Sequence, residues 1–358
     1  MRSAKSTVAL LFCPDSCAFR AAVILMHRLF MRDSMEKPKA RHYRYLFGPV
    51  RSRRLGVSLG VDLMPHKTCT LDCVYCECGK TTRKTLVRKE YIPTLDIMDE
   101  LDDLLSSAPD LDYVTFSGAG EPTLHSGIGE MIAFLKRDHP RYPVALLTNG
   151  TLFHNPRVRD EISDADRVIA SLDGATSGVF KKVNRPHSAL RVTEMIQGLV
   201  DFRQAFSHQF FIEIFIVPGL NDSDSELSAL KSALGRIQPD GVHLNTLDRP
   251  GTEPWVKPAG DTALKKIANA LGGAGLIRFH PKGRHKKVAG DIGDIQLIET
   301  LLRRPCTAED VAAIFDINTQ MAQDRMERLV ADGLAQKKRM PRGTFYFMQK
   351  NAHVCKTG

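Results

Sequence analysis

Three cysteines in one short stretch carry the clearest chemistry in this sequence. Cys69, Cys73 and Cys76 follow the spacing Cys-x3-Cys-x2-Cys. Three thiolates at this spacing can each hold one iron of a [4Fe–4S] cube, which leaves the fourth iron without a protein ligand. The open iron can bind a substrate or a cofactor, and the aromatic Tyr75 stands directly before the last cysteine. The spacing therefore predicts an iron–sulfur cluster with one open coordination site.

Two other interpretations suit these cysteines less well. A structural zinc site takes four ligands, usually in two separated pairs, and no second Cys-x2-Cys pair follows. A disulfide framework does not suit eight cysteines spread over 358 residues without a clear export signal. Cys78 could be a cluster neighbour, part of a second ligand set or a bystander. We expect a bystander, because a fourth thiolate would close the open iron.

Length and charge set loose bounds on the class of protein. The 358 residues suffice for one large α/β domain and a small second one, and the 43% of hydrophobic residues supports a real core. The formal net charge of +9 favours contact with nucleic acid or another polyanion without establishing it. No apolar run reaches the roughly 18 residues of a membrane span. We therefore expect a cytoplasmic protein with no membrane partner.

Residues 1–40 form an extension that we expect to lie outside the functional core. Its two apolar runs are broken by Cys13, Pro14 and Asp15, as in a poor signal peptide. The alternative is an upstream start, with the functional chain opening at or near Met35.

Alternating β-like runs and amphipathic stretches predict a barrel over residues 41–273. Six β/α repeats imply a parallel sheet with right-handed crossovers. Such a sheet curls into a partial (β/α)6 barrel of the TIM type, an α/β fold whose functional groups lie at the C-terminal ends of the strands. The expected strands are 55–63, 113–116, 144–147, 167–172, 211–217 and 241–247, and the expected helices are 94–107, 126–138, 155–163, 188–204, 223–236 and 261–271.

A basic linker and a small second domain follow the barrel. We place the linker at 274–290, where residues 278–287 carry five Lys or Arg and no acid. Residues 291–350 are predicted to form three helices and a two-stranded ribbon, a combination that resembles a winged helix. We expect this domain to have a core of its own, formed by Ile295, Leu302, Met326 and Leu329.

A glycine-rich motif follows the second predicted strand. In Ser117-Gly-Ala-Gly-Glu-Pro122, Gly118 and Gly120 allow the backbone to approach a ligand closely. Glu121 supplies a charge that can hold an ammonium group. Glycine-rich turns after strands are common, so this motif alone is a weak signal.

Polar residues also follow the next two strands. Asn149 ends the third strand, and Ser171 and Asp173 end the fourth. Their amide, hydroxyl and carboxylate groups suit the ribose and polar tail of a nucleoside. Arg185 further on can pair bidentately with a carboxylate. The alternatives are a turn or capping residue for Asn149 and a surface charge for Arg185.

Together these motifs resemble those of the radical S-adenosylmethionine (SAM) superfamily, in the order that the family requires. The resemblance covers residues 48–250, and the opening segment 48–56 favours the branch of wyosine-synthase-like Fe–S oxidoreductases. It implies a reduced [4Fe–4S] cluster whose open iron binds SAM, and a reductant such as flavodoxin or ferredoxin. Cleavage of SAM would then give methionine and a 5′-deoxyadenosyl radical that abstracts hydrogen from a substrate.

The resemblance also implies roles for single residues. Glu121 would grip the SAM amino group, with Ala119 between the two glycines as an accepted variant. Arg185 would pair with the SAM carboxylate, and Gly219 would lie in the turn that reads adenine. The implied metal ligands are Cys69, Cys73 and Cys76, and the implied cofactor-binding residues are Tyr75, Gly118, Gly120, Glu121, Asn149, Ser171, Asp173, Arg185 and Gly219.

The positive net charge and the wyosine-synthase-like branch favour a macromolecular substrate, and RNA or tRNA is the class that we expect. The segment 41–54 mixes basic and aromatic residues, which suits phosphates and bases, and the ribbon adds Lys337, Lys338, Arg339 and Arg342. One alternative is an activase or modifying enzyme that docks a partner protein on the winged helix. Another is an Fe–S regulator whose winged helix binds DNA, although Asp324 and Glu327 on the third helix disfavour a major-groove role.

Overall fold

A curved, mostly parallel sheet forms the centre of the protein, whose computed structural model describes residues 43–276 and 294–348. The strand order is β1-β2-β5-β6-β7-β8-β9-β10, with β1 antiparallel to β2 and every later neighbour parallel. The six predicted strands are therefore confirmed as an α/β parallel sheet that is open between its edges, β1 and β10. The strands are β1 (Leu46–Ser52), β2 (Gly56–Val61), β5 (Tyr113–Phe116), β6 (Val144–Thr148), β7 (Arg167–Ser171), β8 (Gln209–Phe215), β9 (Gly241–Asn245) and β10 (Gly275–Leu276).

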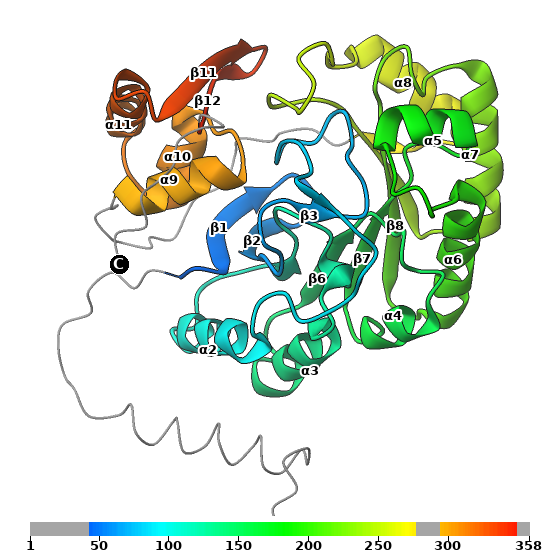
Figure 1. Ribbon diagram of the computed structural model, residues 1–358, viewed down its shortest axis with the longest axis horizontal. Coiled ribbons are helices and arrows are strands. Elements are labelled where there is room, and N and C mark those ends of the chain that lie inside the picture. Colours follow the sequence, from blue (N-terminus) through cyan, green and yellow to red (C-terminus); the bar gives the residue numbers. More distant parts are fainter. Residues whose placement is uncertain (1–42, 277–293, 349–358) are drawn as a thin grey trace, which may run out of the picture. The chain divides into compact units, whose positions relative to one another are not determined.

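Helices follow the strands and run around the outside of the curved sheet (Figure 1). The six predicted helices are confirmed, whereas the two-turn helix α5 was not predicted, because eight residues show too little periodicity. Thr176 caps α5 by accepting the amide of Val179. The helices are α2 (Thr94–Leu105), α3 (Ile128–Asp138), α4 (Pro156–Glu161), α5 (Ser177–Asn184), α6 (Val192–Ala205), α7 (Asp224–Ile237) and α8 (Asp261–Ala270).

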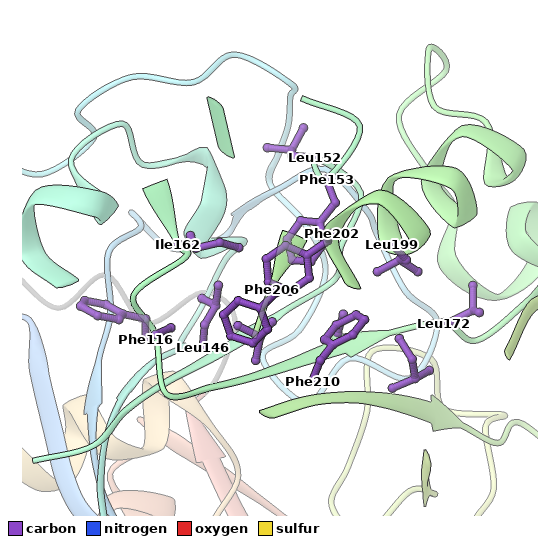
Figure 2. Close-up of a cluster of buried hydrophobic side chains, with 14 of the residues drawn as sticks. Phe116, Leu146, Leu152, Phe153, Ile162, Leu172, Leu199, Phe202, Phe206 and Phe210 are labelled. Carbon is purple, nitrogen blue, oxygen red and sulfur yellow. The ribbon is translucent and has the colours of Figure 1, made fainter. Parts of the chain in front are cut away.

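Aromatic side chains fill the space between the sheet and the helices (Figure 2). Phe202 of α6 stacks on Phe206 with ring centroids 4.6 Å apart, and it meets Phe210 of β8 edge-on at 5.0 Å. The ring centroid of Phe153 lies 4.5 Å from that of Phe202. Each such pair adds about 0.5–1.5 kcal/mol beyond the area that it buries. This core therefore holds α6 against the first residues of β8.

The three helices and the ribbon predicted near the C-terminus are confirmed. Met326 and Leu329 are buried as expected, but Leu302 is 45% exposed, and Leu297 and Leu301 face the core instead. The predicted apolar face of the first helix was therefore wrong by one position, and the side chain of Ile295 is outside the described part. The elements are α9 (Asp294–Arg303), α10 (Ala308–Phe315), α11 (Thr319–Ala331), β11 (Ala335–Met340) and β12 (Gly343–Met348).

The C-terminal unit has a core of its own, as expected, and its β11–β12 hairpin also shares a second hydrophobic cluster with the barrel. Phe345 is fully buried, and it belongs with Met340 to a cluster that includes Val74 of the cysteine loop and Phe215 at the end of β8. The hairpin therefore covers residues beside the cysteines as well as its own helices.

An ion-pair network joins the same two parts of the chain. Arg249, in the loop after β9, donates to Asp310 at 2.9 Å and to the carbonyl of Pro305 at 2.7 Å. Arg342 in the hairpin turn pairs with Asp310 and with Asp248. Asp310 also completes the capping box that opens α10. One carboxylate thus serves as helix cap and as partner for two guanidinium groups.

Two predicted segments, residues 1–40 and the basic stretch 278–287, lie outside the described residues. Within the described ranges, no helix is both long enough and apolar enough to cross a membrane.

We expect Phe345→Ala to lower the free energy of unfolding of the full-length protein by about 3–5 kcal/mol, because it empties a buried site between hairpin and barrel. Urea unfolding measures this change. Met321→Ala on α11 is the matched control, since that side chain is 42% exposed and its loss should change stability by about 0.5 kcal/mol or less. Equal stability of the two variants would mean that the hairpin does not pack on the barrel.

Candidate functional site

A cavity of about 180 Å³ lies where the parallel strands end, as expected for the functional edge of such a sheet. Of the twelve residues predicted from the sequence, three do not line it, namely Asp173, Arg185 and Gly219. The nine that line it are Cys69, Cys73, Tyr75, Cys76, Gly118, Gly120, Glu121, Asn149 and Ser171.

The cysteine loop is held in place by its neighbours along the sheet. It begins at the short strand β3 (Thr68–Cys69), which pairs with β4 (Arg83–Lys84). The amides of Asp72 and Val74 donate to the carbonyls of Asn184 and Val183 at the end of α5. On the other side, the hydroxyl of Thr252 donates to the carbonyl of Cys76 at 3.0 Å. These bonds set the positions of the thiols before any metal binds.

Each cysteine sulfur of the motif accepts one N–H donor. Lys67 Nζ lies 2.6 Å from Cys76 Sγ, Asn184 Nδ2 lies 3.4 Å from Cys73 Sγ, and Asn149 Nδ2 lies 3.5 Å from Cys69 Sγ. Donors of this kind stabilise thiolates and tune the metal that they bind. The donors stand at the start of the loop, at the end of α5 and after β6.

The thiol pKa values show why the donors are needed. Burial raises the pKa of Cys69 to about 11 and raises that of Cys73 well above its usual value. The pKa of Cys76 is instead lowered, by a hydrogen bond with Cys78 and by the ammonium group of Lys67. Burial alone would lower the pKa of Lys67, but the neighbouring Cys76, Cys78 and Cys69 raise it. A buried cation therefore compensates the thiolates.

This donor set fits a [4Fe–4S] cluster. Three buried thiols, each with an N–H donor, line one cavity. In the described part of the chain, no three His, Cys, Asp or Glu side chains converge on a single ion site. A cube binds its thiolates at separate corners, whereas structural zinc takes four converging ligands. Cys78 is outside the cavity lining, and its thiol donates to the carbonyl of Gly118 at 3.5 Å.

The glycine-rich turn after β5 leaves no room for side chains. A Cβ atom on Gly120 would lie 2.1 Å from the carbonyl oxygen of Thr68, so only glycine lets this turn touch the strand that carries Cys69. Gly118 has φ +142°, and a Cβ atom there would lie 2.4 Å from the carboxylate of Asp62. Asp62 accepts the amide of Ala119, and burial raises its pKa to about 6.

Glu121 enters the cavity wall with its carboxylate already oriented. One oxygen accepts the amide and hydroxyl of Thr123 and the hydroxyl of Thr148, and the other accepts the amide of Asn149 at 2.8 Å. Burial raises the pKa of Glu121, and these hydrogen bonds oppose that rise. An oriented, desolvated carboxylate of this kind can hold an ammonium group.

Asp173 supports the site from behind the cavity wall. It accepts the hydroxyl of Tyr75, Asn184 Nδ2 at 2.6 Å and the amide of Phe215 at 2.8 Å. The ring of Tyr75 stacks on Phe215 with centroids 3.7 Å apart. Asp173 therefore orients Tyr75 and Asn184, and through Asn184 the sulfur of Cys73.

Arg185 and Gly219 lie away from the cavity. The guanidinium of Arg185 pairs with Glu253, and its backbone is left-handed with φ 44°. Gly219 turns the chain after β8 with φ +79°, and its amide donates to Asp222. Asn149 takes the turn position given as its alternative role, since its Oδ1 accepts the amide of Thr151, and its Nδ2 also reaches Cys69, a contact that the sequence did not predict.

Three charged residues of the cavity were missed by the sequence analysis, namely Lys67, Arg54 and Glu213. Arg54 donates bidentately to Glu213, which lowers the carboxyl pKa although burial opposes this. The sequence could have indicated Glu213, because it is the single acid in the largely apolar strand β8. Its partner lies 159 residues away in the sequence and could not be identified from it.

Comparison with known proteins decides the family. The family model described as "Radical SAM superfamily" matches residues 63–230. A UPF0026 protein of Helicobacter pylori strain J99 is 33% identical over 282 residues, which are 76% of this chain and 88% of that protein. The chain belongs to the UPF0026 family, within the radical SAM superfamily. It is therefore a radical SAM enzyme, with a [4Fe–4S] cluster and SAM as cofactors.

Two further similarities cover less of the other protein. A protein of Brachyspira hyodysenteriae named GTPase Obg is 31% identical over 308 residues, which are 85% of this chain but 45% of that protein. The chain thus spans less than half of this relative. The crystal structure of a radical SAM methyltransferase from Sphaerobacter thermophilus has a TM-score of 0.48 and 16% identity, covering 61% of this chain and 64% of the other.

We expect Cys69→Ala, Cys73→Ala and Cys76→Ala each to abolish the brown colour of protein reconstituted without oxygen. Wild type should bind about four irons per chain, because each thiol holds one corner of the cube. Iron and sulfide analysis with absorbance spectra measures this. Cys78→Ala is the matched control and should keep its iron, since its thiol does not line the cavity. A full cluster in Cys73→Ala would refute the ligand assignment.

We expect Asp62 to make stability depend on pH. Its folded pKa of about 6 lies above the value of about 3.9 in an unfolded chain, so the folded state binds more protons between these values. Its stabilising contribution is therefore full below about pH 4 and is lost as the pH rises through 6. Between pH 5 and pH 8, wild type should lose about 1.4 kcal/mol of unfolding free energy relative to Asp62→Asn.

Urea unfolding of both proteins at pH 5 and pH 8 measures this difference. Asp224→Asn, which removes an exposed carboxyl group, is the control for a general charge effect. Parallel pH dependence of wild type and Asp62→Asn would contradict the role of Asp62.

Proposed function

We propose that this radical SAM enzyme binds its cluster on Cys69, Cys73 and Cys76. We propose further that it uses the 5′-deoxyadenosyl radical made from SAM to modify RNA, and that tRNA is the first class of RNA to test. The observation that carries the proposal is one cavity in which three donor-supported thiols meet an oriented carboxylate at the strand ends. When bound, the reduced cluster supplies the electron that splits SAM into methionine and a 5′-deoxyadenosyl radical.

The residues of this chain bind and orient the cofactor. Glu121 holds the SAM ammonium group, because its carboxylate lines the cavity and is oriented by four donors. Ser171 offers a hydroxyl group at the end of β7 for the ribose. Phe345 and Met340 of the hairpin cover Val74 and so limit access of water to one side of the cysteine loop.

Exposed cations support a nucleic-acid substrate. Arg339 lies on the exposed face of β11 beside Lys337, which pairs with Glu327 at 2.8 Å, and the chain carries a net charge of +9. Arg342 does not belong to this surface, because Asp310 and Asp248 occupy it. The proposal includes the wyosine-synthase-like branch, a winged helix at 291–350 and a one-electron donor such as flavodoxin or ferredoxin.

The test is SAM cleavage by full-length protein reconstituted without oxygen, measured as 5′-deoxyadenosine. We expect total RNA to raise the rate severalfold and lysate protein to leave it unchanged. The RNA concentration for half-maximal stimulation should rise steeply with salt, because phosphate contacts release counterions. The RNA concentration for half-maximal stimulation should also rise in the double variant Lys337→Gln and Arg339→Gln, because this variant loses two charges that can contact phosphates.

The matched control is Arg157→Gln, which removes one exposed charge from α4. Stimulation by lysate protein and not by RNA would refute the RNA proposal and favour the alternative of a partner protein. Binding of duplex DNA without any change in SAM cleavage would favour the regulator instead.

A further inference from the structure

A second cavity, of about 120 Å³, adjoins the first and is rich in arginine. Arg54 and Leu147 line both cavities, so the second begins where the first ends. Its wall contains four arginines and a single acid, Glu77, which directly follows Cys76. Hydroxyl groups complete the polar lining, from Ser52, Ser58, Thr115 and Ser117.

Two of the four guanidinium groups are satisfied by the protein itself. Arg54 is bound bidentately by Glu213. Arg249 donates to Asp310 and to the carbonyl of Pro305. Arg54 links the turn before β2 to β8 within the barrel, and Arg249 links the barrel to the C-terminal helices, so both have structural partners.

The other two guanidinium groups lack such partners. Arg53 has Glu77 Oε1 at 3.8 Å, which is too long for a hydrogen bond. Burial lowers the pKa of Arg53, and the charge of Glu77 opposes this shift. Arg304 forms no ion pair with any described residue. Glu77, the one acid of this wall, lies closer to Arg249, with Oε2 3.4 Å from Nε, so it gives neither Arg53 nor Arg304 a hydrogen-bonded counter-ion.

We propose that this cavity binds a phosphate group of the substrate between Arg53 and Arg304, while the reacting part of the substrate lies in the first cavity. The inference rests on the proposed function and assigns one phosphate group of that substrate to a defined place beside the first cavity. Guanidinium forks match phosphate oxygens, and two of them on separate elements suit a dianion better than one carboxylate. The volume holds a phosphate group and not a whole nucleotide.

The first experiment measures pyrophosphate binding to full-length, reconstituted protein by calorimetry without oxygen. We expect Arg53→Gln and Arg304→Gln each to weaken binding about tenfold, because each loses charge-assisted hydrogen bonds. Arg53→Lys should lie between wild type and Arg53→Gln, since it keeps the charge and loses the fork. Arg157→Gln on α4 removes an exposed charge and should bind as wild type.

Iron content shows whether each variant still folds. If Arg53→Gln loses its iron, the pyrophosphate affinities of Arg304→Gln and Arg53→Lys test the proposal instead. Unchanged pyrophosphate affinity in the variants that retain iron, or no binding by wild type, would overturn the proposal.

A second experiment identifies the source of the phosphate. A 5′-mononucleotide and a short single-stranded RNA compete with pyrophosphate in separate titrations, and unphosphorylated guanosine is the negative control. Competition by either phosphorylated probe supports the subsite and names its source, and competition by guanosine alone overturns it. This outcome is separate from the RNA proposal, because pyrophosphate binding does not require RNA to stimulate SAM cleavage.

Discussion

The buried thiols of Cys69, Cys73 and Cys76 set the constraint on which the rest of the structure depends. Burial disfavours the thiolate that binds iron, so each sulfur needs an N–H donor or a cation nearby. The donors Lys67, Asn149 and Asn184 come from the start of the loop, the end of β6 and the end of α5. The cysteine loop is therefore tied to distant parts of the barrel.

The C-terminal unit takes part in the same arrangement. Phe345 is buried against the cysteine loop, and Asp310 binds Arg249 of the barrel and Arg342 of the hairpin while it caps α10. Removing one partner of such a buried pair leaves an uncompensated charge, so the contact resists separation. The small domain is thus better described as a cover for one side of the site than as an independent module.

The four arginines of the second cavity differ in whether a carboxylate of the protein binds them. Arg54 and Arg249 each have a carboxylate within hydrogen-bond distance, and their role is explained by the fold. Arg53 and Arg304 line the same cavity without equivalent partners. Two guanidinium groups without a hydrogen-bonded carboxylate suit an anion, and an anionic substrate group next to the first cavity fits both the charge and the volume.

The amino-acid sequence alone determined six strands and six helices of the barrel, the cysteine spacing and nine of the residues that line the cavity, but not β1, β10 or α5. These features are local, because a strand end or a three-residue spacing depends on neighbours along the chain. Only the tertiary structure decided that Asp173 stands behind Tyr75, that Arg185 pairs with Glu253, and that Lys67 contacts Cys76. The separation of Arg54 from Glu213 by 159 residues gives the physical reason, since packing between distant elements chooses the partner of each buried charge.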